Sequence, residues 1–177
     1  DDSKVVIGYL SGSITHNADF ELVLPTITEI MKKYAHVYLK VVGILDLPEE
    51  LKPFSERILK EPFVSWKKLP DIVASLDINL APLEDSLFNR AKSENKWVEA
   101  ALCKVPTVAS DVGAFQEMIV DGKDGFLCKN EKDWFSVLDK LIVNKELRRK
   151  VGEEAYSRVI KNNITTYTGY PLTKFIA

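Results

Sequence analysis

Residues 93–109, SENKWVEAALCKVPTVA, place a helical stretch directly before an apolar strand. The segment from about Ser93 to Cys103 predicts a helix with apolar and small residues on one side. Pro106 then opens a short run to Ala109 that contains the β-branched residues Thr107 and Val108, which predicts a buried strand. A helix followed at once by a fully apolar strand is typical of parallel βαβ units, whose strands are covered on both faces.

The same alternation extends outward in both directions. Further strands are predicted at residues 5–10, 37–42, 58–63, 77–82 and 125–128. Further helices are predicted from Asn17, at 66–76, up to Met118, at 131–143 and at 145–162, and Pro25 predicts a kink or a fresh start within the first of them. The pattern predicts an α/β fold: a Rossmann-like, doubly wound parallel sheet of about six strands with helices on both faces.

Length and charge restrict the function classes. With 177 residues, the chain is long enough for one ordinary domain, and we expect residues 1–161 to form it. The segment 162–177 carries many rings and one charge, so we expect it to pack on this domain or on a missing N-terminal domain. The net charge of -2 gives no overall cationic field, which disfavours nucleic acid as a partner.

The chain has the pattern of a soluble cytoplasmic protein. No apolar run approaches the length of a membrane span, and the start of the chain lacks a signal core. Cys103 and Cys128 are predicted to be reduced core thiols, with a single disulfide as the alternative. The closing helix carries a net charge of about +3, which predicts a solvated face and leaves peripheral association of the full-length protein with the inner membrane face as an alternative.

Residues 95–110 resemble a pattern of glycosyltransferase family 4. Lys96 is followed three residues later by Glu99, then by small helical residues and by Pro106 at the start of an apolar strand. Similar segments follow in the same order: residues 111–113 with Glu117, residues 121–127, and residues 146–149 with Gly152. The resemblance covers about residues 4–160 and implies the C-terminal, donor-binding half of a GT-B fold.

The resemblance also implies a reaction. A sugar would pass from a nucleoside-diphosphate sugar to an acceptor hydroxyl of a saccharide or protein, with retention of configuration and without a bound metal or other cofactor. The acceptor would be held by a separate N-terminal domain, so we expect this chain to bind the donor but not to transfer sugar alone. The alternative is a non-catalytic nucleotide-binding or interaction module with the same fold. A receiver-like or flavodoxin-like domain is disfavoured, because the first strand ends without paired acids or a phosphate loop.

The start of the helix near Ser93 is the predicted diphosphate site. Negative charge develops on the leaving diphosphate, and cations and a helix N-terminus stabilise it. Lys92, Lys96 and Asn95 lie at this place, although both lysines could instead be solvated surface residues. Lys96 is also a predicted catalytic residue.

Two acidic positions carry the sugar-binding prediction. By resemblance, Glu99 accepts hydrogen bonds from the ribose hydroxyls, and its alternative is an ion pair with Lys96 one turn away. Family members usually carry another Glu eight residues earlier, where this chain has Ala91. Glu94 is the predicted catalytic substitute near the donor sugar, with a capping role at the helix start as the alternative.

Two loops complete the predicted donor site. Where many relatives have Arg and Lys after the first strand, this chain offers hydrogen-bond donors and a flexible glycine at four positions: Gly12, Ser13, His16 and Asn17. The loop after the third strand contains Ser65 and Trp66, and Trp66 could stack on the nucleobase, although a staple into the core is the favoured interpretation. Neither Gly-x-Gly-x-x-Gly nor Asp-x-Asp occurs, which disfavours a dinucleotide and a metal-clamped diphosphate.

Overall fold

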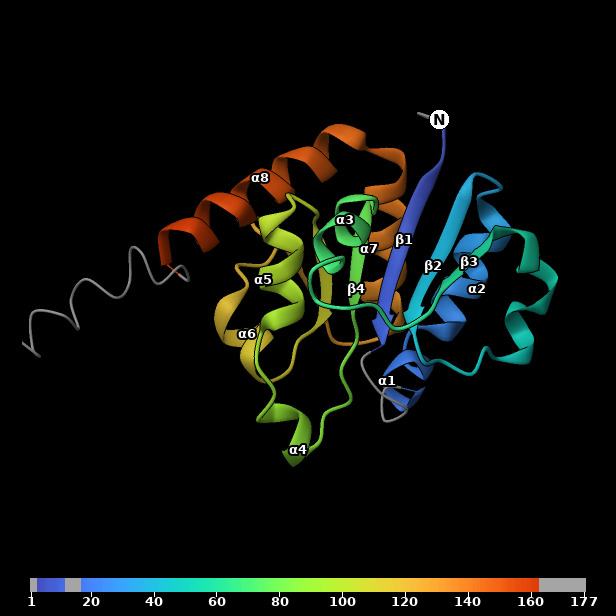
Figure 1. Cartoon of the computed structure of the whole chain (residues 1–177), viewed down its shortest axis with the longest axis horizontal. Helices are drawn as coiled ribbons and strands as arrows, with labels where there is room; N and C mark the ends of the chain where they lie inside the picture. Colours follow the sequence, from blue (N-terminus) through green and yellow to red (C-terminus); the bar gives the residue numbers. More distant parts are fainter. Residues whose placement is uncertain (1–2, 12–16, 163–177) are drawn as a thin grey trace, which may run out of the picture.

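A computed structural model describes residues 3–11 and 17–162. Within this part of the chain, six parallel strands form one sheet in the order β3-β2-β1-β4-β5-β6 (Figure 1). The strands are β1 (Val5–Ser11), β2 (Val37–Gly43), β3 (Ile58–Glu61), β4 (Ile78–Ala81), β5 (Thr107–Ser110) and β6 (Phe126–Cys128). The predicted Rossmann-like parallel sheet is confirmed. Its order reverses between β1 and β4, and this switch point is where open α/β sheets place their ligands.

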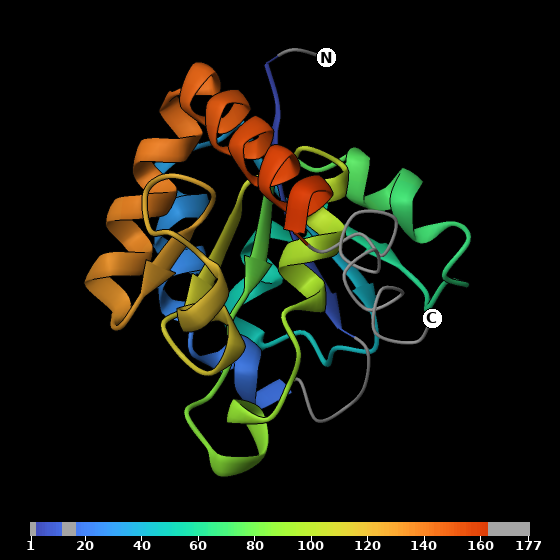
Figure 2. The ribbon, with the colours of Figure 1, turned by 90° about the vertical axis from the view of Figure 1, so that its left-hand side faces the viewer.

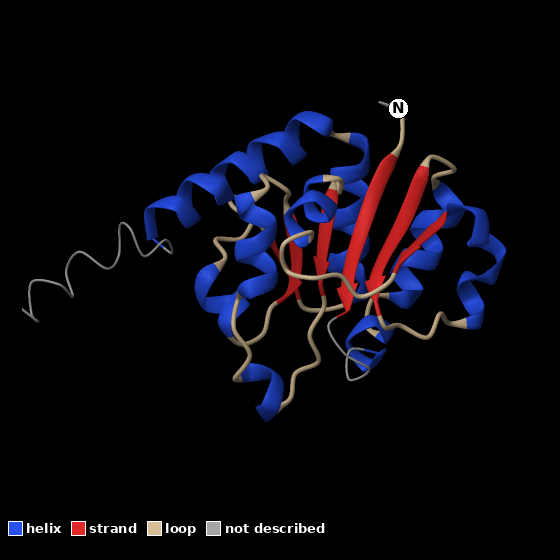
Figure 3. Cartoon of the chain, in the orientation of Figure 1, coloured by secondary structure: helices blue, strands red, loops and turns tan. Residues whose placement is uncertain are grey.

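Helices cover both faces of the sheet (Figures 2 and 3). On one face, α2 (Leu24–Lys33) and α7 (Glu131–Val143) bury a large apolar cluster against the strands, which includes Ile27, Leu138 and Ile7. On the other face lie α3 (Leu69–Ala74), α5 (Asn95–Leu102) and α8 (Lys145–Asn162). The strands are thus covered on both sides, and β4 and β5 are buried at every position.

Shorter helices fill the connections. They are α1 (Asn17–Glu21), the 3-10 helix η2 (Glu49–Arg57), α4 (Leu87–Arg90) and α6 (Ala114–Met118). The prediction of a fresh start at Pro25 is confirmed: α1 ends at Glu21, and α2 begins at Leu24 with the proline in its first turn. η2 and α4 were not predicted, and α4 projects beyond the carboxyl edge of the sheet (Figure 1).

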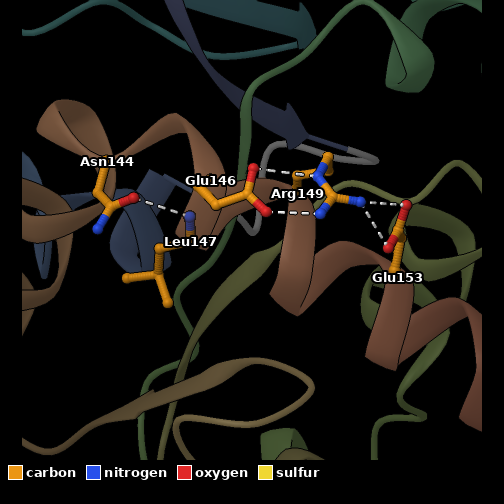
Figure 4. A network of polar contacts seen from close by, with 5 residues as sticks. All are labelled: Asn144, Glu146, Leu147, Arg149 and Glu153. Carbon is orange, nitrogen blue, oxygen red and sulfur yellow. Dashed lines mark hydrogen bonds and ion pairs between the residues drawn. The ribbon is translucent and has the colours of Figure 1, made fainter.

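The start of α8 is fixed by a polar network (Figure 4). Asn144 Oδ1 accepts a hydrogen bond from the Leu147 amide at 2.9 Å, as an N-cap does. The Arg149 guanidinium lies between Glu146, at 2.5 Å, and Glu153, at 2.9 Å. These three residues form an intrahelical charge network on the exposed side of α8.

The basic residues of α8 are only in part a solvated face. Arg148 is buried and donates to the carbonyl oxygens of Leu141 and Ile142 at 2.7 and 3.0 Å. Arg158 pairs with the buried Asp124 at 2.6 Å. The predicted solvated face is therefore wrong for Arg148, because its guanidinium satisfies the carbonyls at the end of α7. Within the described residues, none of the helices combines the length and the apolar character required to cross a bilayer.

α8 and the end of α5 approach each other at backbone distance. A Cβ added at Gly152 would lie 1.9 Å from the Lys104 carbonyl oxygen. Trp97 and Trp134 are buried, Cys128 is a buried free thiol, and Cys103 is a partly exposed free thiol. The predicted packing of the segment from residue 162 onward concerns residues 163–177, which lie outside the described residues.

Candidate functional site

The first turn of α5 lies at the carboxyl edge of the sheet, beside the switch point between β1 and β4. Two buried contacts hold it there. Asn79 of β4 donates from Nδ2 to the Lys96 carbonyl at 3.1 Å, and the Trp97 indole donates to the Asp124 carbonyl at 2.9 Å. The helix start therefore has a fixed position relative to the sheet.

Two cavities meet at this helix start. The first, which we name the β1 cavity, has a volume of about 290 Å³ and is lined by Leu10, Ser11, Val42, Gly43, Phe63, Val64, Trp66, Leu69, Asn95, Lys96 and Glu99. The second, the β4 cavity, has about 400 Å³ and is lined by Pro82, Leu83, Lys92, Ser93, Asn95, Lys96 and Phe115. Asn95 and Lys96 line both cavities. The structure therefore brings Trp66 together with five predicted residues at or near the start of α5: Lys92, Ser93, Asn95, Lys96 and Glu99.

Gly43 shapes the floor of the β1 cavity. Its φ of +95° is unfavourable for other residues, and a Cβ there would lie 1.9 Å from the Ser11 carbonyl oxygen. The backbones of β1 and β2 can therefore approach closely where the two strands end.

Lys96 is the unusual group of this site. Its Nζ is buried and has no hydrogen-bond partner, and it lies 5.1 Å from the centre of the Tyr9 ring. The pKa of Lys96 is lowered to about 8, chiefly by burial; the charge of Lys92 acts in the same direction, whereas the charges of Asp19 and Glu99 oppose the shift. The interpretation of Lys96 as a solvated surface residue is therefore wrong. A buried ammonium with three unsatisfied donors is a group to which an anion can bind with a large gain.

Lys92 forms an ion pair with Asp19, a buried acid that the sequence analysis missed. The Lys92 Nζ lies 3.5 Å from Asp19 Oδ2 and 5.4 Å from the centre of the Phe88 ring. The same carboxylate accepts from the Glu84 amide at 2.8 Å and from Asn89 Nδ2 at 3.3 Å. The only sequence signal of Asp19 is that this charged residue directly precedes the apolar Phe20, in a helix whose apolar face is buried.

Glu99 is half-buried in the β1 cavity, one turn after Lys96. Burial raises its pKa, and the positive charge of Lys96 partly offsets this rise. Because the Lys96 Nζ makes no hydrogen bond, the alternative of an intrahelical ion pair is not realised in the structure. The Glu99 carboxylate remains available to accept hydrogen bonds from a ligand.

The remaining residues of the α5 start differ in their placement. Ser93 and Asn95 are exposed at the rim of the β4 cavity. Glu94 occupies the N-cap position, but its side chain makes no capping hydrogen bond and lines neither cavity. Its catalytic role stays a prediction.

Trp66 is exposed, so the favoured interpretation as a staple into the core is wrong. Its side chain is 78% exposed, and that of Phe63 is 70% exposed. α3 begins only at Leu69, so Trp66 lies in a turn that runs over the surface, and its ring borders the β1 cavity. Ser65 is exposed and lines neither cavity.

Part of the predicted first loop lies outside the described residues. This applies to Gly12, Ser13 and His16. Asn17 is the first residue of α1, and its side chain is likewise not described. Among residues 3–11 and 17–162, no group of three or more His, Cys, Asp or Glu side chains gathers closely enough to hold a metal ion.

Several solved structures share this fold. Staphylococcus aureus TarM, solved as a mutant with fondaparinux, α-GlcNAc-glycerol and UDP, matches with a TM-score of 0.78 and 16% identity over 99% of this chain and 36% of its own. Anabaena HepE, solved with UDP-glucose, matches with a TM-score of 0.74 and 16% identity over 98% and 49%. The C-terminal domain of the Francisella tularensis glycosyl transferase group 1 protein LpcC matches with a TM-score of 0.65 and 21% identity over 90% and 86%.

Sequence comparisons point the same way. The trehalose synthases of Thermococcus litoralis and Pyrococcus furiosus are each 28% identical over 102 residues, which is 58% of this chain and 22% of each relative. The chain thus spans about a fifth of the length of these curated relatives. A family model described as Glycosyl transferases group 1 matches residues 4–144. The predicted likeness to the C-terminal half of a GT-B fold is confirmed, and the chain belongs to the glycosyl transferases group 1 family.

Proposed function

We propose that this chain is the donor-binding domain of a glycosyltransferase that moves a sugar from a nucleoside-diphosphate sugar to an acceptor hydroxyl. The observation that carries the proposal is the buried Lys96 Nζ, which has no hydrogen-bond partner and lies where two cavities meet at a helix start. A diphosphate there would receive charge-assisted hydrogen bonds from Lys96, and further stabilisation from Lys92 and the α5 dipole.

The two cavities differ in the ligand chemistry that they favour. The β1 cavity offers the rings of Phe63 and Trp66 to a planar base and the Glu99 carboxylate to ribose hydroxyls. The β4 cavity, with Lys92 and Ser93 at its wall, is available to the diphosphate and the sugar. Stabilising the charge that develops on the diphosphate during bond cleavage is the contribution of this half to catalysis.

The finer features rest on resemblance and are part of the proposal. We propose transfer with retention of configuration and without a metal, with Lys96 and Glu94 in the catalytic site and a separate domain that binds the acceptor saccharide or protein. The UDP-glucose bound in HepE supports a uridine nucleotide as the donor. Close relation to family 4, a role in polysaccharide biosynthesis and a cytoplasmic location at the inner membrane face complete the proposal.

One observation favours a second candidate, a non-catalytic nucleotide-binding or interaction module. Ala91 is exposed and has no carboxylate to offer to the donor sugar. Such a module would bind a nucleoside diphosphate with the same affinity whether or not a sugar is attached. An increase in affinity when the sugar is present therefore favours the transferase.

Nucleotide binding is the direct test. A nucleoside diphosphate at 100 times its dissociation constant should stabilise the chain by about 2.7 kcal/mol in a thermal melt. We expect UDP, rather than GDP, dTDP or ADP, to give the largest shift. Glu99→Ala should weaken UDP binding by about 10- to 100-fold, since a hydrogen bond to a charged group is lost. Glu146→Ala, on the exposed side of α8, is the matched control and should bind UDP like the wild type; a chain that none of the four nucleotides stabilises would refute donor binding.

The affinity for UDP should also depend on pH. Lys96 has a pKa of about 8 in the free protein, and a diphosphate binds its protonated form better. Affinity should therefore change little between pH 7 and 7.5 and then fall toward about tenfold per pH unit above the pKa. Isothermal titration calorimetry from pH 7 to 9.5 measures this. Lys96→Met should remove the dependence, and an equally steep fall in that variant would show that another group titrates.

A further inference from the structure

We propose that Asp19 is a positioning residue of the donor site, which fixes the connection between β4 and α5 (residues 82–94) so that Lys92 faces the β4 cavity. The inference rests on the proposed function for the identity of the ligand. Its geometric basis is independent of that function. Asp19 lies on α1, far in sequence from the connection that it contacts.

The Asp19 carboxylate, which is 1% exposed, holds three points of the connection at once. Oδ1 accepts from the Glu84 amide at 2.8 Å and from Asn89 Nδ2 at 3.3 Å. Oδ2 lies 3.5 Å from the Lys92 Nζ. A carboxylate is buried at this depth only when several donors compensate its lost hydration, and three of these donors come from the connection.

The middle of the connection has little apolar packing of its own, whereas Leu83 at its start is buried in the core. Leu87 and Phe88 of α4 are 89% and 73% exposed, and α4 projects beyond the sheet edge (Figure 1). At the β4 end, the Leu83 amide donates to Ser110 Oγ at 2.8 Å. Further along, Asn89 is buried, and its side-chain amide donates to Asp19 and to the Glu84 carbonyl, which belongs to the connection itself. Among the described residues, Asp19 supplies the side-chain acceptor that anchors the central part of the connection, while the Arg90 backbone also lies close to Gly113.

The position of this anchor matters for the ligand. Lys92 and Ser93, at the end of the connection, form part of the wall of the β4 cavity. The Asp19 charge also raises the pKa of Lys96 and so favours its protonated form. If the anchor were lost, the β4 cavity would lose this part of its wall, whereas the β1 cavity is lined by other elements.

The test separates the two cavities by using uridine, which fits the β1 cavity alone, and UDP, which reaches both. Asp19→Ala and Asp19→Asn should lower the ratio of UDP affinity to uridine affinity by about tenfold, because the charged contact from Lys92 is misplaced. Uridine affinity should stay within about twofold of the wild type, since β1-cavity contacts are preserved. Asp139→Asn, which neutralises another carboxylate that accepts two side-chain hydrogen bonds and lines neither cavity, is the control and should leave the ratio unchanged.

Two outcomes would overturn the inference. If Asp19 acted only as a nearby negative charge, both variants would bind UDP more tightly than the wild type at pH 6.5, well below the pKa of Lys96. If Asp19 had only a general structural role, its variants would melt at lower temperature with an unchanged affinity ratio. Amide exchange measured by NMR tests the anchor without a ligand: the Glu84 amide should exchange faster in Asp19→Ala, while the Tyr9 amide in β1 stays protected. If the wild type binds neither uridine nor UDP, the proposed function fails, and amide exchange still decides whether Asp19 holds the connection.

Discussion

Lys96→Met is expected to weaken UDP binding by about 10- to 100-fold and to leave the free protein at least as stable as the wild type. Methionine has a similar length and no charge, so the variant removes an ammonium that is buried without a hydrogen-bond partner. Removing a structural ion pair would lower both stability and binding. A loss of binding at constant or higher stability is the property of a residue that is kept for its ligand.

Calorimetric titration with UDP and chemical unfolding of the free protein give the two measurements. Lys33→Met is the matched control, because Lys33 is an exposed lysine paired with Asp139 at 2.6 Å. It should bind UDP like the wild type. If Lys96→Met unfolded more easily than the wild type by more than 1 kcal/mol, as a structural ion pair would predict, Lys96 would have to be assigned to the fold rather than to the ligand.

Gly152→Ala is expected to destabilise the chain by roughly 2 kcal/mol and to lower the melting temperature by about 4 to 8 °C. Alanine favours helix over glycine by up to about 1 kcal/mol, so propensity alone predicts the opposite sign. The added Cβ, however, would lie 1.9 Å from the Lys104 carbonyl oxygen, a backbone atom that cannot rotate away. The clash therefore decides the sign, and α8 must shift from α5.

Gly122→Ala is the comparison for Gly152. Gly122 has a φ of +74° and no atom within 4 Å of an added Cβ, so its substitution tests backbone strain without a clash. Its cost should be near 1 to 2 kcal/mol, the usual penalty for a left-handed residue. Thermal unfolding of both variants is the measurement, and a Gly152→Ala protein as stable as the wild type would show that α8 and α5 are not packed at this distance.

The fold was predictable because its information is local. Most strands of the sheet are short apolar runs that a turn signal and a helical stretch follow, so most of the order of elements could be derived from periodicity. The same logic placed the restart at Pro25. α4 was missed because it is only four residues long and its Leu87 and Phe88 are exposed, so it has no periodic apolar face to detect.

The sequence predicted where the site lies, but not the burial and the contacts of its side chains. The resemblance identified Lys96 and Glu99. The burial of the Lys96 Nζ without a hydrogen-bond partner, however, results from tertiary packing, which a local pattern does not show. Trp66 was misjudged because the sequence does not show that α3 begins three residues later. Asp19 was missed because Glu84, Asn89 and Lys92, which it contacts, lie about 65 to 73 positions away, beyond the reach of any local pattern.

The shared wall of the two cavities has a thermodynamic consequence. A nucleoside and a separate sugar phosphate would each lose translational freedom on binding, and only the second would neutralise the ammonium of Lys96. A single molecule that spans both cavities loses that freedom once and satisfies the ammonium as well, so its second half binds at a high effective concentration. The affinity of the intact nucleotide sugar should then exceed what these two fragments predict.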